Sequence, residues 1–144
     1  LLCAGRDEGM LASLEKLTQQ LQLQDNVKWL GPRKDVMTLM RAADVGVLCS
    51  YTEGFSNVML ESMVAGLPMI ATDISGNNEA VIDQSTGVLV EPGNPEQLSA
   101  AILELAFDSG KREEFGANSR VRVETLFSIN SCIGKYENLY AAIT

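Results

Sequence analysis

The fold is decided by residues 45–61, which read Val45-Gly46-Val47-Leu48-Cys49-Ser50-Tyr51-Thr52-Glu53-Gly54-Phe55-Ser56-Asn57-Val58-Met59-Leu60-Glu61. An apolar run ends at Ser50, a short loop containing Gly54 follows, and a helix is predicted to begin near Asn57 with Ser56 as its N-cap. A buried strand, a glycine-containing loop and a helix in this order indicate one unit of a parallel α/β sheet.

The same alternation of apolar runs and amphipathic stretches extends on both sides of this segment. Leucines at positions 11, 14, 17 and 21 recur at helical spacing and predict one apolar helix face, and residues 36–43 repeat the pattern. Strands that are apolar throughout, each followed by a helix, indicate a parallel sheet covered on both faces. The sequence therefore predicts a doubly wound, Rossmann-like α/β fold. The predicted strands are residues 1–5, 27–31, 45–50, 68–73 and 87–90.

The last third of the chain is predicted to be helical, without strands between the helices. Asn94 is a capping residue, Pro95 suits the first helical position, and Gln97 stands where a capping box places its partner. A second helix is predicted over 111–124. A third is predicted over 129–143, where apolar side chains alternate at spacings of four and three.

The loop and helix start in this segment have the features of a phosphate site. In an open α/β sheet, ligands bind in the crevice at the carboxyl ends of the strands. A helix start there offers unpaired amides and about half a positive charge, which suits a diphosphate, and Gly54 lets the backbone approach closely. Glu61 lies one turn after Asn57 on the same face, where its carboxylate would accept hydrogen bonds from the vicinal hydroxyls of a ribose. Glu53 precedes the helix and would reach the group on the other side of the phosphates.

Either glutamate taken alone has a plainer interpretation. A glutamate in the first turn of a helix is favoured by the helix dipole, and most loop glutamates are simply solvated. The two carboxylates together, with Gly-Phe-Ser-Asn-Val between them, favour the ligand-binding interpretation.

This segment resembles the Glu-x(7)-Glu signature of the retaining glycosyltransferases of family 4, which have the two-lobed GT-B fold. Glu53 and Glu61 occupy the two signature positions. One such match is a weak signal, whereas several ordered blocks at family spacing are a strong one. Two departures, Ser62 in place of alanine and Ser75 in place of glycine, are both tolerable. The further blocks that resemble the family lie at 27–31, 35–36, 42–45, 65–73, 75–79 and 87–90.

The resemblance implies transfer of a sugar from a nucleoside diphosphate donor to an acceptor hydroxyl, with retention at the anomeric carbon and without a metal or other cofactor. By matched position, Glu53 is the candidate catalytic residue and would contact the donor sugar, and Glu61 would hold the ribose hydroxyls. The remaining candidates are backbone amides for the diphosphate (Phe55, Ser56, Asn57 and Val58, beside Gly54) and a loop bordering the base (Gly31, Pro32 and Arg33).

The resemblance also predicts that the chain is a piece of a longer enzyme. The first residues read as a core strand entered without a lead-in. The family's acceptor lobe, and a basic pair that neutralises the diphosphate, would lie upstream. We therefore interpret the chain as a partial C-terminal lobe, a single domain with a donor-binding core at 1–107 and C-terminal helices at 108–144. Alone it is expected to bind nucleotide weakly and to transfer no sugar, because the carbohydrate or glycolipid acceptor would bind to the missing lobe.

The amino-acid composition excludes several classes of binding partner and binding site. The chain has 11 lysine and arginine residues against 19 aspartate and glutamate residues, and this net charge of −8 argues against nucleic acid. No window approaches the ~20 apolar residues of a membrane span, and no signal peptide is evident. Without histidine, and with three widely spaced cysteines, a zinc site is not expected and the thiols are predicted to be reduced and buried. We expect a cytoplasmic protein. Peripheral association with a membrane stays open, because many such enzymes act on lipid-linked substrates.

Two alternatives remain. An epimerase or phosphorylase would share the two lobes, but such enzymes usually place histidine or a cofactor lysine in the site, and this chain has no histidine. A non-catalytic nucleotide-binding module is the other alternative. The intact Glu53 and Glu61 argue for the enzyme.

Overall fold

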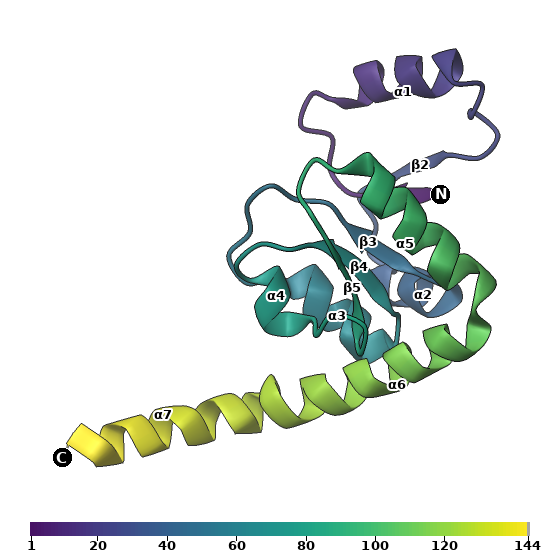
Figure 1. The fold of residues 1–144 in the computed structure, drawn as a ribbon. Coiled ribbons are helices and arrows are strands. Elements are labelled where there is room, and N and C mark those ends of the chain that lie inside the picture. Colours follow the sequence, from purple (N-terminus) through teal and green to yellow (C-terminus); the bar gives the residue numbers. More distant parts are fainter. Residues whose placement is uncertain (144) are drawn as a thin grey trace. The chain divides into compact units, whose positions relative to one another are not determined.

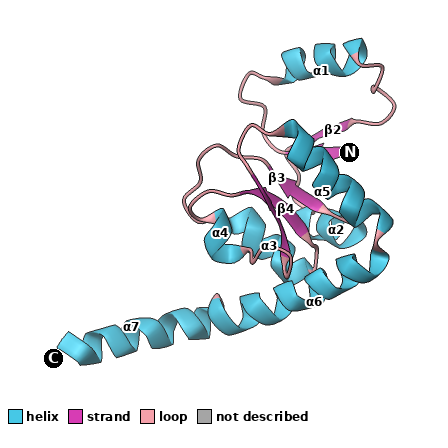
Figure 2. Cartoon of the chain, in the orientation of Figure 1, coloured by secondary structure: helices cyan, strands magenta, loops and turns pink. Residues whose placement is uncertain are grey.

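The computed structural model describes residues 1–143 as alternating strands and helices, which confirms the predicted α/β fold class (Figures 1 and 2). Each predicted strand is present, and only the last keeps its predicted bounds. The strands are β1 (Leu2–Ala4), β2 (Lys28–Gly31), β3 (Gly46–Leu48), β4 (Met69–Thr72) and β5 (Gly87–Val90). The helices are α1 (Leu11–Gln20), α2 (Val36–Ala42), α3 (Asn57–Ala65), α4 (Asn77–Ala80), α5 (Pro95–Phe107), α6 (Ser109–Leu126) and α7 (Ile129–Ile143). The chain divides into two compact units, Leu1–Val36 and the chain from Met37 onward.

The first unit contains helix α1 and the parallel pair of β1 and β2. Leu2 lies opposite Lys28, and Ala4 lies opposite Gly31 after a shift in register. Helix α1 lies wholly within the described residues and buries none of its side chains, and its Leu17 is 48% exposed. The apolar stripe predicted from the leucine spacing is therefore present, but nothing within this unit covers it.

Asp7 fixes the start of α1 through its carboxylate. Its Oδ1 accepts hydrogen bonds from the N–H groups of Gly9 (2.8 Å), Met10 (3.0 Å) and Leu11 (3.1 Å). These bonds, that from Leu11 first, lower the pKa of Asp7 below its ordinary value of 3.8. A carboxylate with a lowered pKa stabilises the folded state above its unfolded pKa, and the contribution is lost as the pH falls through the folded pKa.

We therefore expect the amide resonances of Gly9 and Leu11 to titrate with one midpoint below pH 3.8, because their hydrogen-bond acceptor is protonated there. Two-dimensional NMR over an acid titration measures that midpoint. In Asp7→Asn the titration should vanish. A midpoint at or above 3.8 would contradict the hydrogen bonds.

The second unit is built on the parallel sheet β3-β4-β5, with β4 in the centre. All four residues of β4 are buried, and the first three, Met69, Ile70 and Ala71, are apolar, as expected for the central strand of a covered parallel sheet. Ile70 of β4 and Val88 of β5 belong to one core with Leu105 of α5 and Phe115 of α6. Helix α3, whose Met59 is 1% exposed, packs against β4 and α6. Because the strands are parallel, their carboxyl ends share one edge, from which the loops to α3, α4 and α5 leave.

Helix α5 begins as predicted, but the capping box is only half formed. Asn94 Oδ1 accepts the N–H of Gln97 (3.0 Å), and Pro95 is the first helical residue. The Gln97 side chain does not return to the N–H of Asn94. Instead its Oε1 accepts the N–H of Glu91 (2.8 Å), which ties the end of β5 to the first turn of α5.

Helix α6 is longer than predicted, and α7 has the predicted bounds. Asp108 Oδ1 accepts the N–H of Lys111 (2.8 Å), so α6 begins at Ser109 rather than at the lysine. Within its described residues, α7 buries no side chain. Its apolar stripe is exposed and consists of Ile129, Ile133, Tyr136, Leu139, Tyr140 and Ile143.

The three cysteines are free. The prediction that they are buried is wrong for Cys49, which follows the last residue of β3, and for Cys132 on α7, because both are exposed; Cys3 is half-buried. In residues 1–143, no helix combines the length and the apolarity that crossing a membrane requires.

Candidate functional site

The β3–α3 connection leads into a helix start with unpaired amides. Helix α3 begins at Asn57, as predicted, and Ser56 is its N-cap, although the Ser56 hydroxyl caps no amide. Helical hydrogen bonding starts with the N–H groups of Met59 (3.1 Å) and Leu60 (3.3 Å), which both donate to the Ser56 carbonyl. The amides of Asn57 and Val58 precede them and, as at any helix start, have no partner within the helix. This end of α3 therefore carries the partial positive charge that favours an anion.

The two candidate carboxylates flank this helix start in the sequence, Glu53 before it and Glu61 within α3. Glu53 is half-buried in the loop, and Ser50 Oγ donates a hydrogen bond to its Oε1 (2.7 Å). Glu61 is exposed on α3, one turn beyond Asn57. Among residues 1–143 neither carboxylate forms an ion pair. Both therefore keep acceptor capacity for the hydroxyl groups of a ligand.

Gly54 and Phe55 show how the loop is held and where it is open. A Cβ built on Gly54 would meet no atom within 4 Å, so the backbone is accessible at this point. On its other side, the Gly54 carbonyl is in close contact with Gly76 in the β4–α4 connection, where a Cβ would lie 1.6 Å from that oxygen. The Phe55 ring packs on Phe127 at the end of α6, with 5.1 Å between the ring centroids. The loop is thus anchored at two points, and its accessible face is the backbone expected to meet a diphosphate.

The residues predicted to border a base belong to the first unit. Gly31 ends β2 with a φ of 62°, and its carbonyl accepts the N–H of Gly5 (3.0 Å). Pro32 and Arg33 are exposed. The Arg33 guanidinium donates to both carboxylate oxygens of Asp35, from Nε (2.8 Å) and Nη2 (2.7 Å), and these bonds lower the pKa of Asp35. This ion pair was not predicted from the sequence, and it supplies Arg33 with a partner before any ligand binds.

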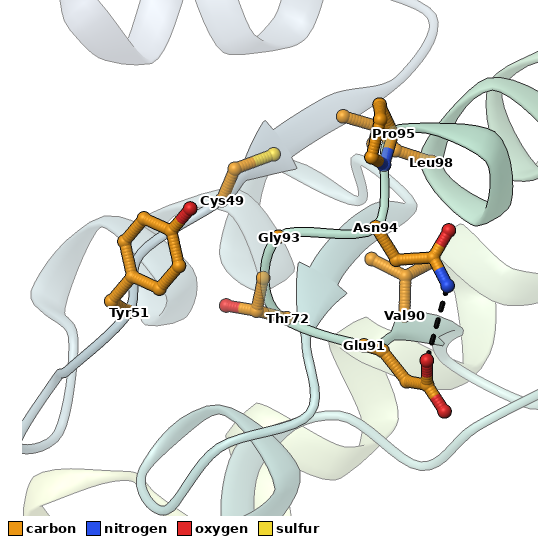
Figure 3. Close-up of a pocket in the computed structure, with 9 residues that line it drawn as sticks. All are labelled: Cys49, Tyr51, Thr72, Val90, Glu91, Gly93, Asn94, Pro95 and Leu98. Atoms are coloured by element: carbon orange, nitrogen blue, oxygen red, sulfur yellow. Dashed lines mark hydrogen bonds between the residues drawn. The ribbon is translucent and has the colours of Figure 1, made fainter.

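A cavity of about 260 Å³ lies at the carboxyl ends of the three strands of the second unit. Figure 3 shows Tyr51 and Cys49 on one side and the segment from Glu91 to Pro95 on the other, with Thr72 between them. The lining residues are Cys49, Tyr51, Thr72, Val90, Glu91, Gly93, Asn94, Pro95 and Leu98.

None of these lining residues was among the candidates from the sequence. The position of ligands at the carboxyl ends of parallel strands, applied to β4 and β5 as well as to β3, is the signal that would have found them. Within residues 1–143, no three His, Cys, Asp or Glu side chains are grouped so that they could hold a metal ion.

Residues 1–122 match the family model described as "Glycosyl transferases group 1". The chain is 31% identical over 145 residues to the D-inositol 3-phosphate glycosyltransferase of Corynebacterium diphtheriae, and the match covers 97% of this chain and 34% of that protein. The chain thus spans about a third of the length of the curated relatives it matches.

Solved structures with a similar fold include a protein in complex with UDP and a sucrose-phosphate synthase. The Anabaena protein HepE in complex with UDP superposes with a TM-score of 0.91 at 25% identity, over 98% of this chain and 40% of that one. The same protein has also been solved with UDP-glucose. Sucrose-phosphate synthase from Thermosynechococcus elongatus superposes with a TM-score of 0.87 at 32% identity, over 99% of this chain and 39% of that one.

Proposed function

The chain belongs to the group 1 glycosyl transferases, and we propose that it is most of the donor-binding C-terminal lobe of a retaining enzyme of family 4, with the two-lobed GT-B fold. One observation carries this proposal. Glu53 precedes and Glu61 follows, within one turn of the first helical residue, a helix start with unpaired amides at the carboxyl edge of a parallel sheet.

The proposed reaction transfers a sugar from a nucleoside diphosphate to an acceptor hydroxyl, with retention at the anomeric carbon and independently of metal. Glu61 binds the ribose hydroxyls, and Glu53 contacts the sugar. The amides from Phe55 to Val58 bind the diphosphate. Negative charge on the diphosphate increases as the bond to the sugar breaks, so the positive end of α3 stabilises the leaving group.

The donor is proposed to be a uridine diphosphate sugar. HepE binds UDP and UDP-glucose, and this chain superposes on it along nearly its whole length. Gly31, Pro32 and Arg33 are the residues proposed to border the base. Because Arg33 is paired with Asp35 (2.7 Å), base binding has to compete with that ion pair or to include it.

Acceptor binding is assigned to a second lobe outside this chain. The chain covers 34% of its relative from Corynebacterium diphtheriae and 40% of HepE, so most of each protein has no counterpart here. In this proposal, residues 1–107 are the donor-binding core and 108–144 are C-terminal helices of one partial domain. The chain alone binds nucleotide weakly and transfers no sugar to a carbohydrate or glycolipid. The enzyme is placed in the cytoplasm, where free thiols such as Cys49 are usual.

Replacing Glu61 by alanine is expected to weaken UDP binding by about ten- to a hundredfold, because a hydrogen bond to a charged group contributes about 1.5–3 kcal/mol. Saturation-transfer NMR of the purified chain, titrated with UDP, measures the loss. Glu124→Ala is the matched control, since Glu124 is an exposed glutamate on α6. Equal UDP affinity in the wild type and Glu61→Ala would overturn the assignment of Glu61 to the ribose.

A further inference from the structure

Glu53 is held in place by a series of hydrogen bonds that leads away from the site into the protein interior. The first bond runs from Ser50 Oγ to Glu53 Oε1 (2.7 Å). Ser50 is half-buried and lies two residues beyond the end of β3. A serine on a free loop would rotate its hydroxyl among several partners, so the position of Glu53 depends on what fixes the backbone of Ser50.

Thr72 fixes that backbone. The parallel pairing of β3 and β4 ends at Leu48 and Ala71, and the next residue of β4 is Thr72, which is 3% exposed. Its Oγ1 donates a hydrogen bond to the carbonyl of Ser50 (2.6 Å). This side-chain bond continues the connection between the two strands beyond the point where their backbone pairing stops. In Figure 3, Thr72 lies between the β3 side and the β5 side of the cavity.

Asn77 in turn fixes Thr72. Its Nδ2 donates to the Thr72 carbonyl (3.0 Å) and to Thr72 Oγ1 (3.2 Å). The threonine hydroxyl has one hydrogen, which goes to Ser50, and it accepts with a lone pair, so the three bonds are compatible in direction. Reversing the Asn77 amide would place its oxygen against two acceptors and break both bonds.

The buried amide oxygen of Asn77 destabilises the fold, because it has no hydrogen-bond partner among residues 1–143. Asn77 is fully buried (0% exposed). A buried, unpaired acceptor destabilises a fold, and a neutral apolar residue there would avoid the loss. The amide group therefore has a role beyond packing, and the role that the contacts indicate is to orient Thr72.

We propose that Thr72 and Asn77 are positioning residues of the donor site, which act through Ser50 to hold the Glu53 carboxylate against the sugar of the donor. This inference rests on the proposed function. Glu61 lies on α3 outside this series of bonds, so the series governs recognition of the sugar and leaves recognition of the nucleotide unchanged.

The test compares UDP-glucose with UDP on the purified chain, by saturation-transfer NMR. Thr72→Val removes the hydroxyl and keeps the shape of the side chain. It is expected to lower the UDP-glucose affinity about three- to tenfold, the range for one hydrogen bond, without changing the UDP affinity. Thr72→Ser keeps the hydroxyl and should restore the wild-type ratio of the two affinities. In a Glu53→Ala background, Thr72→Val should cause no further loss, because the two residues act on the same contact.

Thr86→Val is the matched control. Thr86 is also 3% exposed and its Oγ1 accepts the N–H of Ile82 (2.8 Å), but it precedes β5 at the opposite end of the sheet. Thr86→Val should leave the ratio of UDP-glucose affinity to UDP affinity unchanged. Should Thr72→Val fail to fold, Ser50→Ala removes the bond to Glu53, the first of the series, at a half-buried position and should lower the ratio in the same way.

The outcomes separate the two hypotheses. A Thr72→Val chain that keeps the wild-type ratio, while Glu53→Ala loses it, overturns the positioning role and leaves the proposed function intact. A wild-type chain that binds neither UDP nor UDP-glucose, or a ratio that Glu53→Ala leaves unchanged, overturns the donor site itself and the positioning role with it.

Discussion

Replacing Gly76 by alanine is expected to abolish measurable UDP binding and to destabilise the fold by about 2–6 kcal/mol. Gly76 has a φ of 88° and a ψ of −48°, a conformation in which a non-glycine residue costs about 1–3 kcal/mol. Its Cβ would lie 1.6 Å from the Gly54 carbonyl oxygen and 2.8 Å from the carbonyl carbon. Overpacking against backbone adds about 1–3 kcal/mol or more, because no side chain can rotate away.

UDP binding is expected to be lost because one of the two loops in contact has to move. To admit the methyl group, either the β4–α4 connection or the loop containing Gly54 must shift by more than an ångström. Gly54 follows Glu53 and precedes the start of α3, so a shift there displaces the carboxylate and the amides together. Urea denaturation measures the stability, and saturation-transfer NMR measures the UDP affinity.

Gly54→Ala is the control for Gly76→Ala, because it adds a methyl group on the open side of the same contact. No atom lies within 4 Å of the added Cβ, and the φ of Gly54 is not in the left-handed region. This variant should keep wild-type stability within about 0.5 kcal/mol, and any loss of UDP affinity would then report a ligand close to the Gly54 backbone. Wild-type stability and binding in Gly76→Ala would show that the two loops are not in contact.

The elements of the fold were predictable because their signals are local. The strand at 87–90 and the helix at 129–143 have their predicted bounds. The start of α5 was predictable because Asn94 and Pro95 act on residues of the same turn. The capping box was wrong in one detail, since Gln97 bonds to Glu91, and sequence spacing alone does not choose between two nearby amides.

The periodicity of an element predicts its apolar face but not the partner of that face. The leucines of α1 have the spacing of a buried stripe, yet α1 buries no residue within its described unit. The stripe of α7 is likewise exposed. A partner for such a face can lie in a segment that the pattern itself does not contain.

The candidate site was predictable in part for the same reason. Glu53 and Glu61 lie in one loop and the helix that follows it, so their spacing determines their arrangement around the helix start. The bond from Thr72 to Ser50 joins residues 22 positions apart, and the contact of Gly76 with Gly54 joins two separate loops. Such contacts depend on the register of the sheet, which no local pattern specifies.

Replacing Gly116 by alanine is expected to destabilise the fold by up to about 2 kcal/mol, although alanine forms helices better than glycine. Gly116 lies in α6 and is buried against the end of α3, where a Cβ would lie 2.2 Å from the carbonyl oxygen of Gly66. Helix propensity alone predicts a gain of about 1 kcal/mol. The contact predicts a larger loss, because backbone of two helices must separate. Gly66 caps α3 in the left-handed conformation (φ 74°), so it cannot rotate away without unwinding that end of the helix.

Gly134→Ala isolates the propensity term from the contact term. Gly134 lies in α7, and a Cβ there meets no atom within 4 Å, so this variant should gain about 0.5–1 kcal/mol. The same glycine-to-alanine change should thus lower the urea midpoint of unfolding in Gly116→Ala and raise it in Gly134→Ala. A gain in both would mean that α3 and α6 are not in contact at Gly66. Opposite signs would instead establish that α3, the helix that carries Glu61, approaches α6 closely at Gly66, as their packing indicates.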